Sequence, residues 1–258
     1  MDAWGDPVTT LLQASGLSKR FGAVVAAADL NIAVQAGERV SLIGSNGAGK
    51  TTFVNMITGY LKPDTGRITL AGRDITALHP RAIARLGVAR SFQIPQLYGE
   101  LTVLDNMLVA NACHDQRLSF WQPARRSEAV DRALALLARF RLADQRERRV
   151  AELPGGVRKL LDIAMALTAR PQLLLLDEPT SGVSADEKFP MMDTLMAALL
   201  GETDTTVLFV EHDMDIVERY ASRVIAFYAG RVIADDMPAR ALATDDVRRY
   251  VTGELTTE

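Results

Sequence analysis

The sequence predicts an α/β protein, and three observations support this fold class. A short apolar strand at residues 39–43 is followed by a glycine-rich stretch and then by a segment with helical spacing. Strand and helix patterns alternate again after residue 159, where four consecutive leucines precede an acidic pair. Between these parts, residues 94–158 have a helical pattern throughout. We therefore expect one domain over residues 8–258, in which 94–158 form a helical subdomain inserted into an α/β core.

Composition sets the broad class. The 258 residues are 48% hydrophobic and carry a net charge of −3, which supports a large core and does not indicate a nucleic-acid partner. A single cysteine, Cys113, fits a reducing compartment. Residues 1–7 are acidic and polar, unlike a signal peptide, and the longest apolar runs are too short to cross a bilayer. We expect a protein that is soluble by itself.

The spacing of apolar residues predicts short strands and helices along the rest of the chain. Strands are expected within residues 8–36, at 67–70, 88–92, 171–176, 206–210, 224–228 and 232–234. Helices are expected at 52–60, 80–86, 101–109 (with Thr102 as a cap), 127–140, 160–167 and 186–200, and two small ones within 238–251. Residues 112–126 read as an irregular insertion, and the charged stretch 141–150 reads as a solvated surface.

The glycine-rich stretch is the strongest motif. It reads Gly44-Ser45-Asn46-Gly47-Ala48-Gly49-Lys50-Thr51-Thr52, which is a phosphate-binding loop between a strand and a helix. Glycines let successive backbone N–H groups point at phosphate oxygens, and the helix adds the positive end of its dipole. Lys50 is expected to neutralise the β- and γ-phosphates, and the Thr51 hydroxyl to bind Mg²⁺. This motif predicts a P-loop NTPase core.

An acidic pair completes the expected nucleotide site. Asp177 and Glu178 follow a leucine-rich strand, and ligands of α/β folds bind at the carboxyl ends of strands. Asp177 is expected to hold Mg²⁺ through water, and Glu178 to act as general base toward the attacking water. The alternative is that two solvated acids simply end a strand, and the upstream phosphate loop favours the catalytic reading.

Three further residues carry weaker signals. Phe21 lies in a polar stretch bounded by glycine, so it either stacks on a purine or fills the edge of the core. His212 follows an apolar strand and could reach a γ-phosphate, although a lone histidine is more often structural. Gln93 follows another strand, which alone indicates little.

Taken in order along residues 10–254, these motifs resemble the ATP-binding subunit of ABC transporters. That resemblance implies an ATPase whose hydrolysis of ATP drives transmembrane transport, with ATP and Mg²⁺ as ligands and an added antiparallel β subdomain. It implies that Phe21 stacks on adenine, that Gln93 senses the γ-phosphate and contacts Mg²⁺, and that His212 is the switch histidine. Leu153-Pro154-Gly155-Gly156-Val157 occupies the place of the family signature Leu-Ser-Gly-Gly-Gln.

A narrower resemblance concerns the segments 89–93, 101–110, 211–214 and 249–254. They are similar to the insertion-bearing ATPase subunit of branched-chain amino acid importers. This resemblance implies import of branched-chain or other hydrophobic amino acids, with urea, amide or lipid transport as alternatives within the family. The resemblance also implies that the solute is bound by other subunits and not by this one.

The chain departs from the family pattern in its signature. Pro154 replaces the serine, Val157 replaces the glutamine, and Ser184 stands where the family has an aspartate that communicates between two ATP sites. Arg158 and Lys159 retain positive charge near the signature or are solvated. We expect Pro154 to preserve the helix start, and the ATP that faces this signature to be hydrolysed slowly.

The resemblance also implies partners. Two ATPase domains of this family enclose two ATP molecules and work on membrane permease subunits, supplied by a periplasmic or extracellular solute-binding protein. We expect a peripheral protein on the cytoplasmic face of the cell membrane, in a heterodimer rather than a homodimer. A non-transport ABC ATPase acting on DNA or ribosomes is disfavoured because residues 93–153 lack sustained heptads. A catalytically dead regulatory module is disfavoured because the ATP-site residues are intact.

Overall fold

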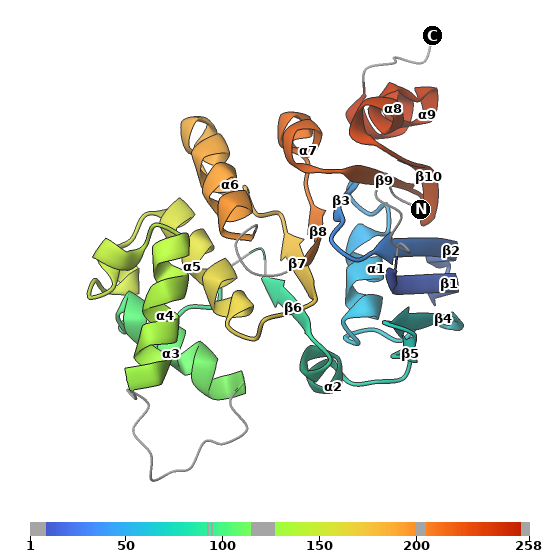
Figure 1. Ribbon diagram of the computed structural model, residues 1–258. Helices are drawn as coiled ribbons and strands as arrows, with labels where there is room; N and C mark the ends of the chain where they lie inside the picture. Colours follow the sequence, from blue (N-terminus) through green and yellow to red (C-terminus); the bar gives the residue numbers. More distant parts are fainter. Residues whose placement is uncertain (1–8, 92, 94, 115–126, 200–204, 254–258) are drawn as a thin grey trace. The chain divides into compact units, whose positions relative to one another are not determined.

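The computed structural model describes residues 9–91, 93, 95–114, 127–199 and 205–253. The chain divides into two compact units. Unit 1 comprises residues 1–88 and 204–258, and unit 2 comprises residues 89–203. The α/β fold class is confirmed, and so is the antiparallel β part (Figure 1).

Unit 1 contains the antiparallel sheet. Its strands are β1 (Thr10–Phe21), β2 (Val24–Gln35), β4 (Thr65–Leu70) and β5 (Arg73–Asp74), in the order β2-β1-β4-β5. β1 and β2 form a hairpin whose turn follows Phe21. Both strands extend beyond the apolar stretches of the sequence. Their pairing runs from Thr10 opposite Gln35 to Phe21 opposite Val24 and includes polar residues.

A second sheet of unit 1 carries the phosphate loop. It contains β3 (Arg39–Gly44), β8 (Thr206–Val210), β9 (Arg223–Tyr228) and β10 (Arg231–Asp236), in the order β10-β9-β3-β8. β3 is parallel to both neighbours, whereas β10 is antiparallel to β9. β3 and β8 are almost wholly buried, as apolar runs in a parallel sheet should be.

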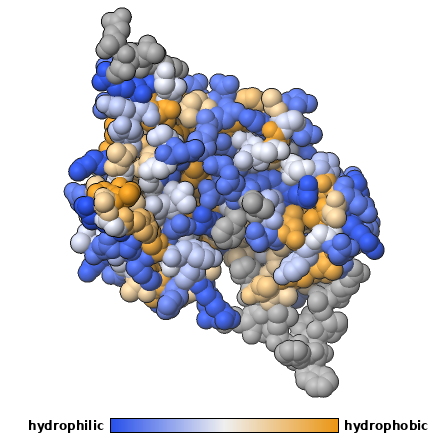
Figure 2. Space-filling model, turned by 180° about the vertical axis from the view of Figure 1, so that it is seen from behind, coloured by the Kyte–Doolittle hydropathy of each residue, from blue (hydrophilic) through white to orange (hydrophobic). Residues whose placement is uncertain are grey.

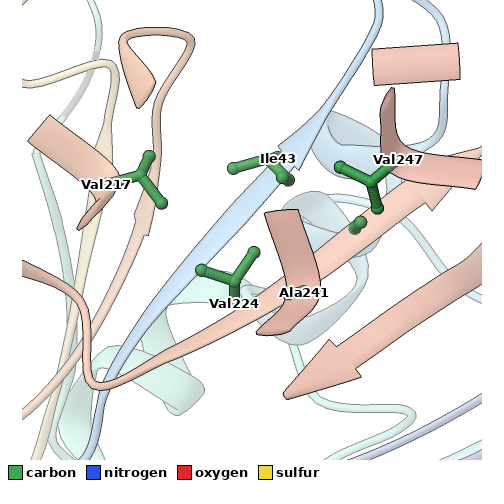
Figure 3. Packing of buried hydrophobic residues seen from close by; sticks show 6 residues of the cluster. Ile43, Val217, Val224, Ala241 and Val247 are labelled. Carbon is green, nitrogen blue, oxygen red and sulfur yellow. The ribbon is translucent and has the colours of Figure 1, made fainter. Parts of the chain in front are cut away.

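Short helices complete unit 1. They are α1 (Lys50–Ile57), α2 (Pro80–Arg85), α7 (Met214–Tyr220), α8 (Pro238–Ala243) and α9 (Asp245–Val247), followed by a π-helical turn (Arg248–Thr252). Ile43 of β3, Val224 of β9 and Val217 of α7 pack with Ala241 and Val247 from the C-terminal helices (Figure 3). This fully buried cluster fixes the strand that leads into the phosphate loop.

Unit 2 is mainly helical. Its elements are β6 (Val88–Ser91, beginning at the last residue of unit 1), β7 (Leu173–Asp177), α3 (Val103–His114), α4 (Ser127–Arg139), α5 (Gly155–Leu167) and α6 (Ala185–Leu199), with 3₁₀ turns at Ala143–Gln145 and Val150–Glu152. β6 and β7 are neighbours in the sheet. The helices α3 to α6 gather in this unit (Figure 1).

Helix boundaries in unit 2 correct two expectations. α3 continues through His114, past the predicted start of an irregular insertion, because no glycine or proline interrupts residues 109–114. The rest of that predicted insertion, 115–126, lies outside the described residues. α5 begins at Gly155 rather than at residue 160, since Pro154 takes the N-cap position. The expected cap at Thr102 is confirmed, because its hydroxyl accepts a hydrogen bond from the N–H of Asp105.

The described part of the chain contains no helix that is long and apolar enough to cross a membrane. Figure 2 shows hydrophilic residues over most of the face it presents, with hydrophobic residues in small groups between them. The predicted solvated stretch 141–150 is mostly exposed or half-buried, but Leu142 and Val150 turn inward and are buried.

One carboxylate of unit 2 is buried. Asp162 of α5 accepts hydrogen bonds from the Ser91 hydroxyl at 2.5 Å and from the N–H of Gln96 at 3.1 Å. Burial raises the pKa of Asp162 above its ordinary value, against the opposing effects of these two bonds and of the Lys159 ammonium. As pH rises through the window between the unfolded and folded pKa values, the unfolded state loses this proton first. Stability contributed by this group is therefore lost as pH rises.

This linkage predicts the effect of Asp162→Asn. The amide oxygen can accept from Gln96 and the amide nitrogen can donate to Ser91, but the group no longer titrates. Relative to the wild type, the variant should gain free energy of unfolding as pH rises from about 4 to 7. Urea denaturation across that range measures the difference. Asp131→Asn, on the exposed side of α4, is the control, and a difference that stays constant with pH for Asp162→Asn would contradict the assignment.

Candidate functional site

Glycine geometry shapes the loop at the end of β3. Gly44, Gly47 and Gly49 all have positive φ, at 148°, 79° and 111°. A Cβ on Gly44 would collide with the carbonyl oxygen of Phe227, and one on Gly49 would lie 2.6 Å from the carbonyl oxygen of Ala26. Only glycine fits at Gly44 and Gly49, because both the backbone angles and the available space exclude a side chain, whereas at Gly47 only the backbone angle favours glycine.

Backbone contacts hold the loop from outside. Gly230, in the turn between β9 and β10, donates its N–H to the carbonyl of Ala48 at 2.9 Å. Its own carbonyl accepts from the N–H of Ala28 in β2 at 2.8 Å. Both sheets of unit 1 therefore contribute to the shape of the loop, which is preorganised for an anion.

The positive charges of the loop come from Lys50 and the start of α1. Lys50 is only 6% exposed, and its ammonium donates to the carbonyls of Gly44 at 2.5 Å and Ser45 at 3.1 Å. The ammonium is thus kept at the loop. Thr51, next along α1, is exposed. A loop of this kind, with glycines that let backbone N–H groups face a ligand, a helix N-terminus and a lysine, fits the phosphates of a nucleotide.

His212 lies at the same edge of the sheet as the loop. β3 and β8 are parallel neighbours, with Leu42 opposite Val210. Two residues further along each strand stand Gly44 and His212, so the register brings the histidine beside the start of the loop. His212 is exposed, and its backbone N–H donates to the buried carboxylate of Glu211 at 3.1 Å.

Phe21 ends β1 with 51% of its surface exposed. The Lys19 ammonium lies 5.8 Å from the centre of its ring. An aromatic side chain this open is not a core residue, so the alternative of an edge-of-core role is wrong. Its exposed face leaves the stacking role open.

The acidic pair belongs to unit 2, at the end of β7. The Asp177 carboxylate is paired with Arg90 of β6, whose Nη2 lies 2.7 Å from Oδ2, and both side chains are largely buried, at 17% and 11% exposed. Glu178 follows in the left-handed region with a φ of 48°. Strain of this kind in a residue other than glycine is concentrated at functional sites.

Gln93 and Glu178 are in direct contact. The Gln93 amide donates to Oε2 of Glu178 at 2.6 Å, across 85 residues of sequence. The structure thus brings together two predicted site residues of unit 2, and Asp177 directly precedes Glu178 in the chain. The phosphate loop, Phe21 and His212 belong to unit 1.

The stretch 153–157 opens helix α5. Leu153 is buried, Pro154 is the N-cap, and Gly155 and Gly156 form the first turn. A Cβ on either glycine would meet nothing closer than 3.7 Å, and neither has positive φ. The fold of the chain does not require these glycines. Pro154 makes no side-chain capping hydrogen bond, so the helix start is preserved without the hydroxyl that a serine would add.

Sequence reasoning missed two cations. Arg90 was assigned no role, yet it pairs with Asp177. For Lys159 the alternative of a solvated side chain is wrong, because the residue is 3% exposed and donates to the backbone of Gln93 and Asp177. A usable signal was Asp162 within the otherwise apolar run 160–167, because a carboxylate in such a helix needs buried polar partners. Arg158, by contrast, is exposed.

Comparisons with known proteins agree with this geometry. A protein-family model described as ABC transporter matches residues 27–181. The high-affinity branched-chain amino acid transport ATP-binding protein LivG of Salmonella typhimurium is 38% identical, over 95% of this chain and 98% of its own length. The corresponding protein BraF of Pseudomonas aeruginosa is also 38% identical, with the same coverage.

Among solved structures, the ADP conformation of an ATP-binding cassette of an ABC transporter is similar to this chain, with a TM-score of 0.82 and 31% identity. It is matched over 93% of this chain and 97% of its own. The family match includes the phosphate loop, Gln93, the stretch 153–157 and the acidic pair, so the motif-based resemblance is confirmed. The chain belongs to the ABC transporter family, as an ATP-binding and ATP-hydrolysing subunit.

Proposed function

We propose that this chain powers an importer of branched-chain or other hydrophobic amino acids, bound to permease subunits at the cytoplasmic face of the membrane. The nucleotide-dependent activity is supported by the phosphate loop, whose shape is held by backbone hydrogen bonds and by closely packed glycines. The solute class is supported by the likeness to LivG and BraF, which extends over almost the whole of both sequences. ATP-driven closure of two such subunits, and opening after hydrolysis, would move the permease between states.

Each site residue has a chemical task. The loop N–H groups and Lys50 bind the phosphates of ATP, and Phe21 offers an aromatic face to the base. Glu178 accepts a proton from the attacking water, Gln93 orients that carboxylate, and His212 contacts the γ-phosphate. The oxygens of Thr51, Gln93 and Asp177 suit Mg²⁺, which offsets phosphate charge when bound. To bind Mg²⁺, the Asp177 carboxylate must give up its ion pair with Arg90.

Glu178→Gln tests the catalytic assignment. Glutamine keeps the shape and can still pair with Gln93, but it does not take a proton. Turnover should fall by about 10²-fold or more, while ATP affinity changes little. ATPase assays and nucleotide titration measure both. Uptake of labelled leucine by cells that depend on this subunit should be lost, whereas labelled urea uptake should not change.

Two variants control that experiment. Glu187→Gln, on the exposed first turn of α6, should leave turnover unchanged. Lys50→Ala should instead weaken ATP binding by about tenfold or more, because it removes a charge-assisted contact. Undiminished hydrolysis in Glu178→Gln would remove this residue from the base role, and leucine uptake that survives the loss of turnover would reject the solute class.

The glycines of α5 support a second ATPase subunit as partner. Glycine in a helix costs about 0.5–1 kcal/mol relative to alanine, and nothing within the chain requires it at these positions. Close approach of another molecule to the exposed start of α5 would explain both glycines. In this family that molecule is the ATP held by the opposing subunit.

Gly155→Ala separates stability from function. The isolated chain should become more stable by up to about 1 kcal/mol, since the new Cβ meets nothing closer than the carbonyl oxygen of Gly182 at 3.7 Å. ATPase activity of the assembled complex should fall by about tenfold or more, because Gly155 is exposed and a side chain there blocks the approach. Denaturant unfolding and steady-state kinetics give the two values. Greater stability with undiminished activity would show that no ligand approaches this glycine.

The altered signature favours a heterodimer. A lost hydrogen bond to a charged oxygen is worth about 1.5–3 kcal/mol, or one to two decades in rate. The ATP facing this chain's signature should therefore react slowly, while the ATP on its own loop faces the partner's signature and reacts faster. A second, better-formed ATPase subunit would supply that signature.

Restoring the consensus tests this asymmetry. Pro154→Ser with Val157→Gln should raise by about tenfold the ATPase activity of a complex in which this chain also carries Glu178→Gln and the partner is intact. Because Glu178→Gln stops hydrolysis of the ATP on this chain's own loop, the measured rate comes only from the ATP that faces this chain's signature. The same background without the signature changes is the control. An unchanged rate would mean that the two glycines and the helix start suffice.

A further inference from the structure

Lys159 ties helix α5 to two other segments of unit 2. Its ammonium donates to the carbonyl oxygen of Gln93 at 3.0 Å and to that of Asp177 at 3.4 Å. The residue is 3% exposed, so these bonds form out of water, where a charged donor binds strongly. One turn after its start, the helix is therefore fixed both to the segment after β6 and to the end of β7.

Asp162 adds a second pair of contacts from the same side of α5. It lies three residues after Lys159, and side chains at that spacing are neighbours on a helix. Its carboxylate accepts from the Ser91 hydroxyl at 2.5 Å and from the N–H of Gln96 at 3.1 Å. The chain is thus held by α5 before Gln93, at Gln93 and after it.

These contacts lead directly to the acidic pair. The Gln93 side chain donates to Glu178 at 2.6 Å, and Arg90, next to Ser91 in β6, pairs with Asp177 at 2.7 Å. Lys159 holds Asp177 by its backbone as well. A displacement of α5 would therefore shift Gln93, which bonds to Glu178, and Asp177, which precedes Glu178 in the chain.

We propose that Lys159 and Asp162 form a brace through which the position of α5 sets the position of Gln93 and Glu178. The start of α5, where Gly155 is exposed and Gly156 half-buried, would contact a ligand of the neighbouring subunit. The brace would then transmit the resulting shift of α5 to Glu178 of this chain. The two residues are positioning residues, because neither touches the reacting atoms. The proposal rests on the proposed function of Gln93 and Glu178.

Lys159→Met is the direct test. Methionine fills a similar volume but donates no hydrogen bond. In the assembled complex, kcat should fall by about tenfold or more while KM for ATP stays within about threefold. Lys159→Arg, which keeps a donor, should recover most of kcat, and Arg132→Met, at an exposed position of α4, should have no effect. Equal kcat for Lys159→Met and the wild type would overturn the proposal.

A double-mutant cycle separates positioning from general packing. Gln93→Ala should reduce kcat in the wild type but have little further effect after Lys159→Met, because both act on one path. Leu160→Ala, a packing change in the same helix, should remain additive with Gln93→Ala. Additivity between Lys159→Met and Gln93→Ala would reject the brace, while a Gln93→Ala variant of normal activity would reject the proposed function instead.

Hydrogen exchange gives a result that does not depend on activity. The N–H of Gln96 is bonded to Asp162, and that of Ser181 to the carbonyl of Glu178. Lys159→Met should speed exchange at both by about tenfold, with α3 unchanged. If Lys159→Met does not fold, Asp162→Ala replaces it, with Asp162→Asn as the variant that keeps both contacts. Exchange that is unchanged at Gln96 and Ser181 would overturn the proposal.

Discussion

Close contact between backbones at the phosphate loop is the constraint on which the site depends. Gly44 lies against the carbonyl of Phe227 and Gly49 against that of Ala26, with no room for a side chain at either position. The turn at Gly230 then bonds to the loop and to β2, so two sheets meet at a few backbone groups. The buried cluster around Ile43 packs against the same strand (Figure 3). A preorganised anion site results because the loop does not have to reorganise around its ligand.

Unit 2 depends on balanced buried charge. Arg90 neutralises Asp177, and Lys159 lies near enough to Asp162 to oppose the rise in its pKa. Burying one of these groups alone would be costly, so each cation and its acid stabilise the fold only together. The same pairs connect β6, α5 and the end of β7, which are the segments that carry Gln93, the signature and the acidic residues. The contacts that balance the buried charges are therefore the same contacts that position the site residues.

The signature illustrates how a substitution can preserve structure while it changes chemistry. Proline at the N-cap of α5 is compatible with the helix start, since it has no N–H to leave unpaired. The glycines that follow remain in place and accessible, whereas the hydroxyl and the amide of the family pattern are gone. This combination is expected of a cassette that still binds its neighbour but contributes less to the reaction there.

Local pattern by itself determined the loop, the strand before it, the acidic pair and most helices, because glycine spacing, apolar periodicity and capping act over a few residues. It also placed His212 and Gln93 after strands. Only the tertiary structure decided that Phe21 is open to solvent, that Arg90 faces Asp177, and that Lys159 turns inward. Lys159 is separated from Gln93 by 66 residues and from Asp177 by 18. Whether a lysine on a helix is solvated or buried depends on which carbonyls packing brings to it, and no local pattern carries that information.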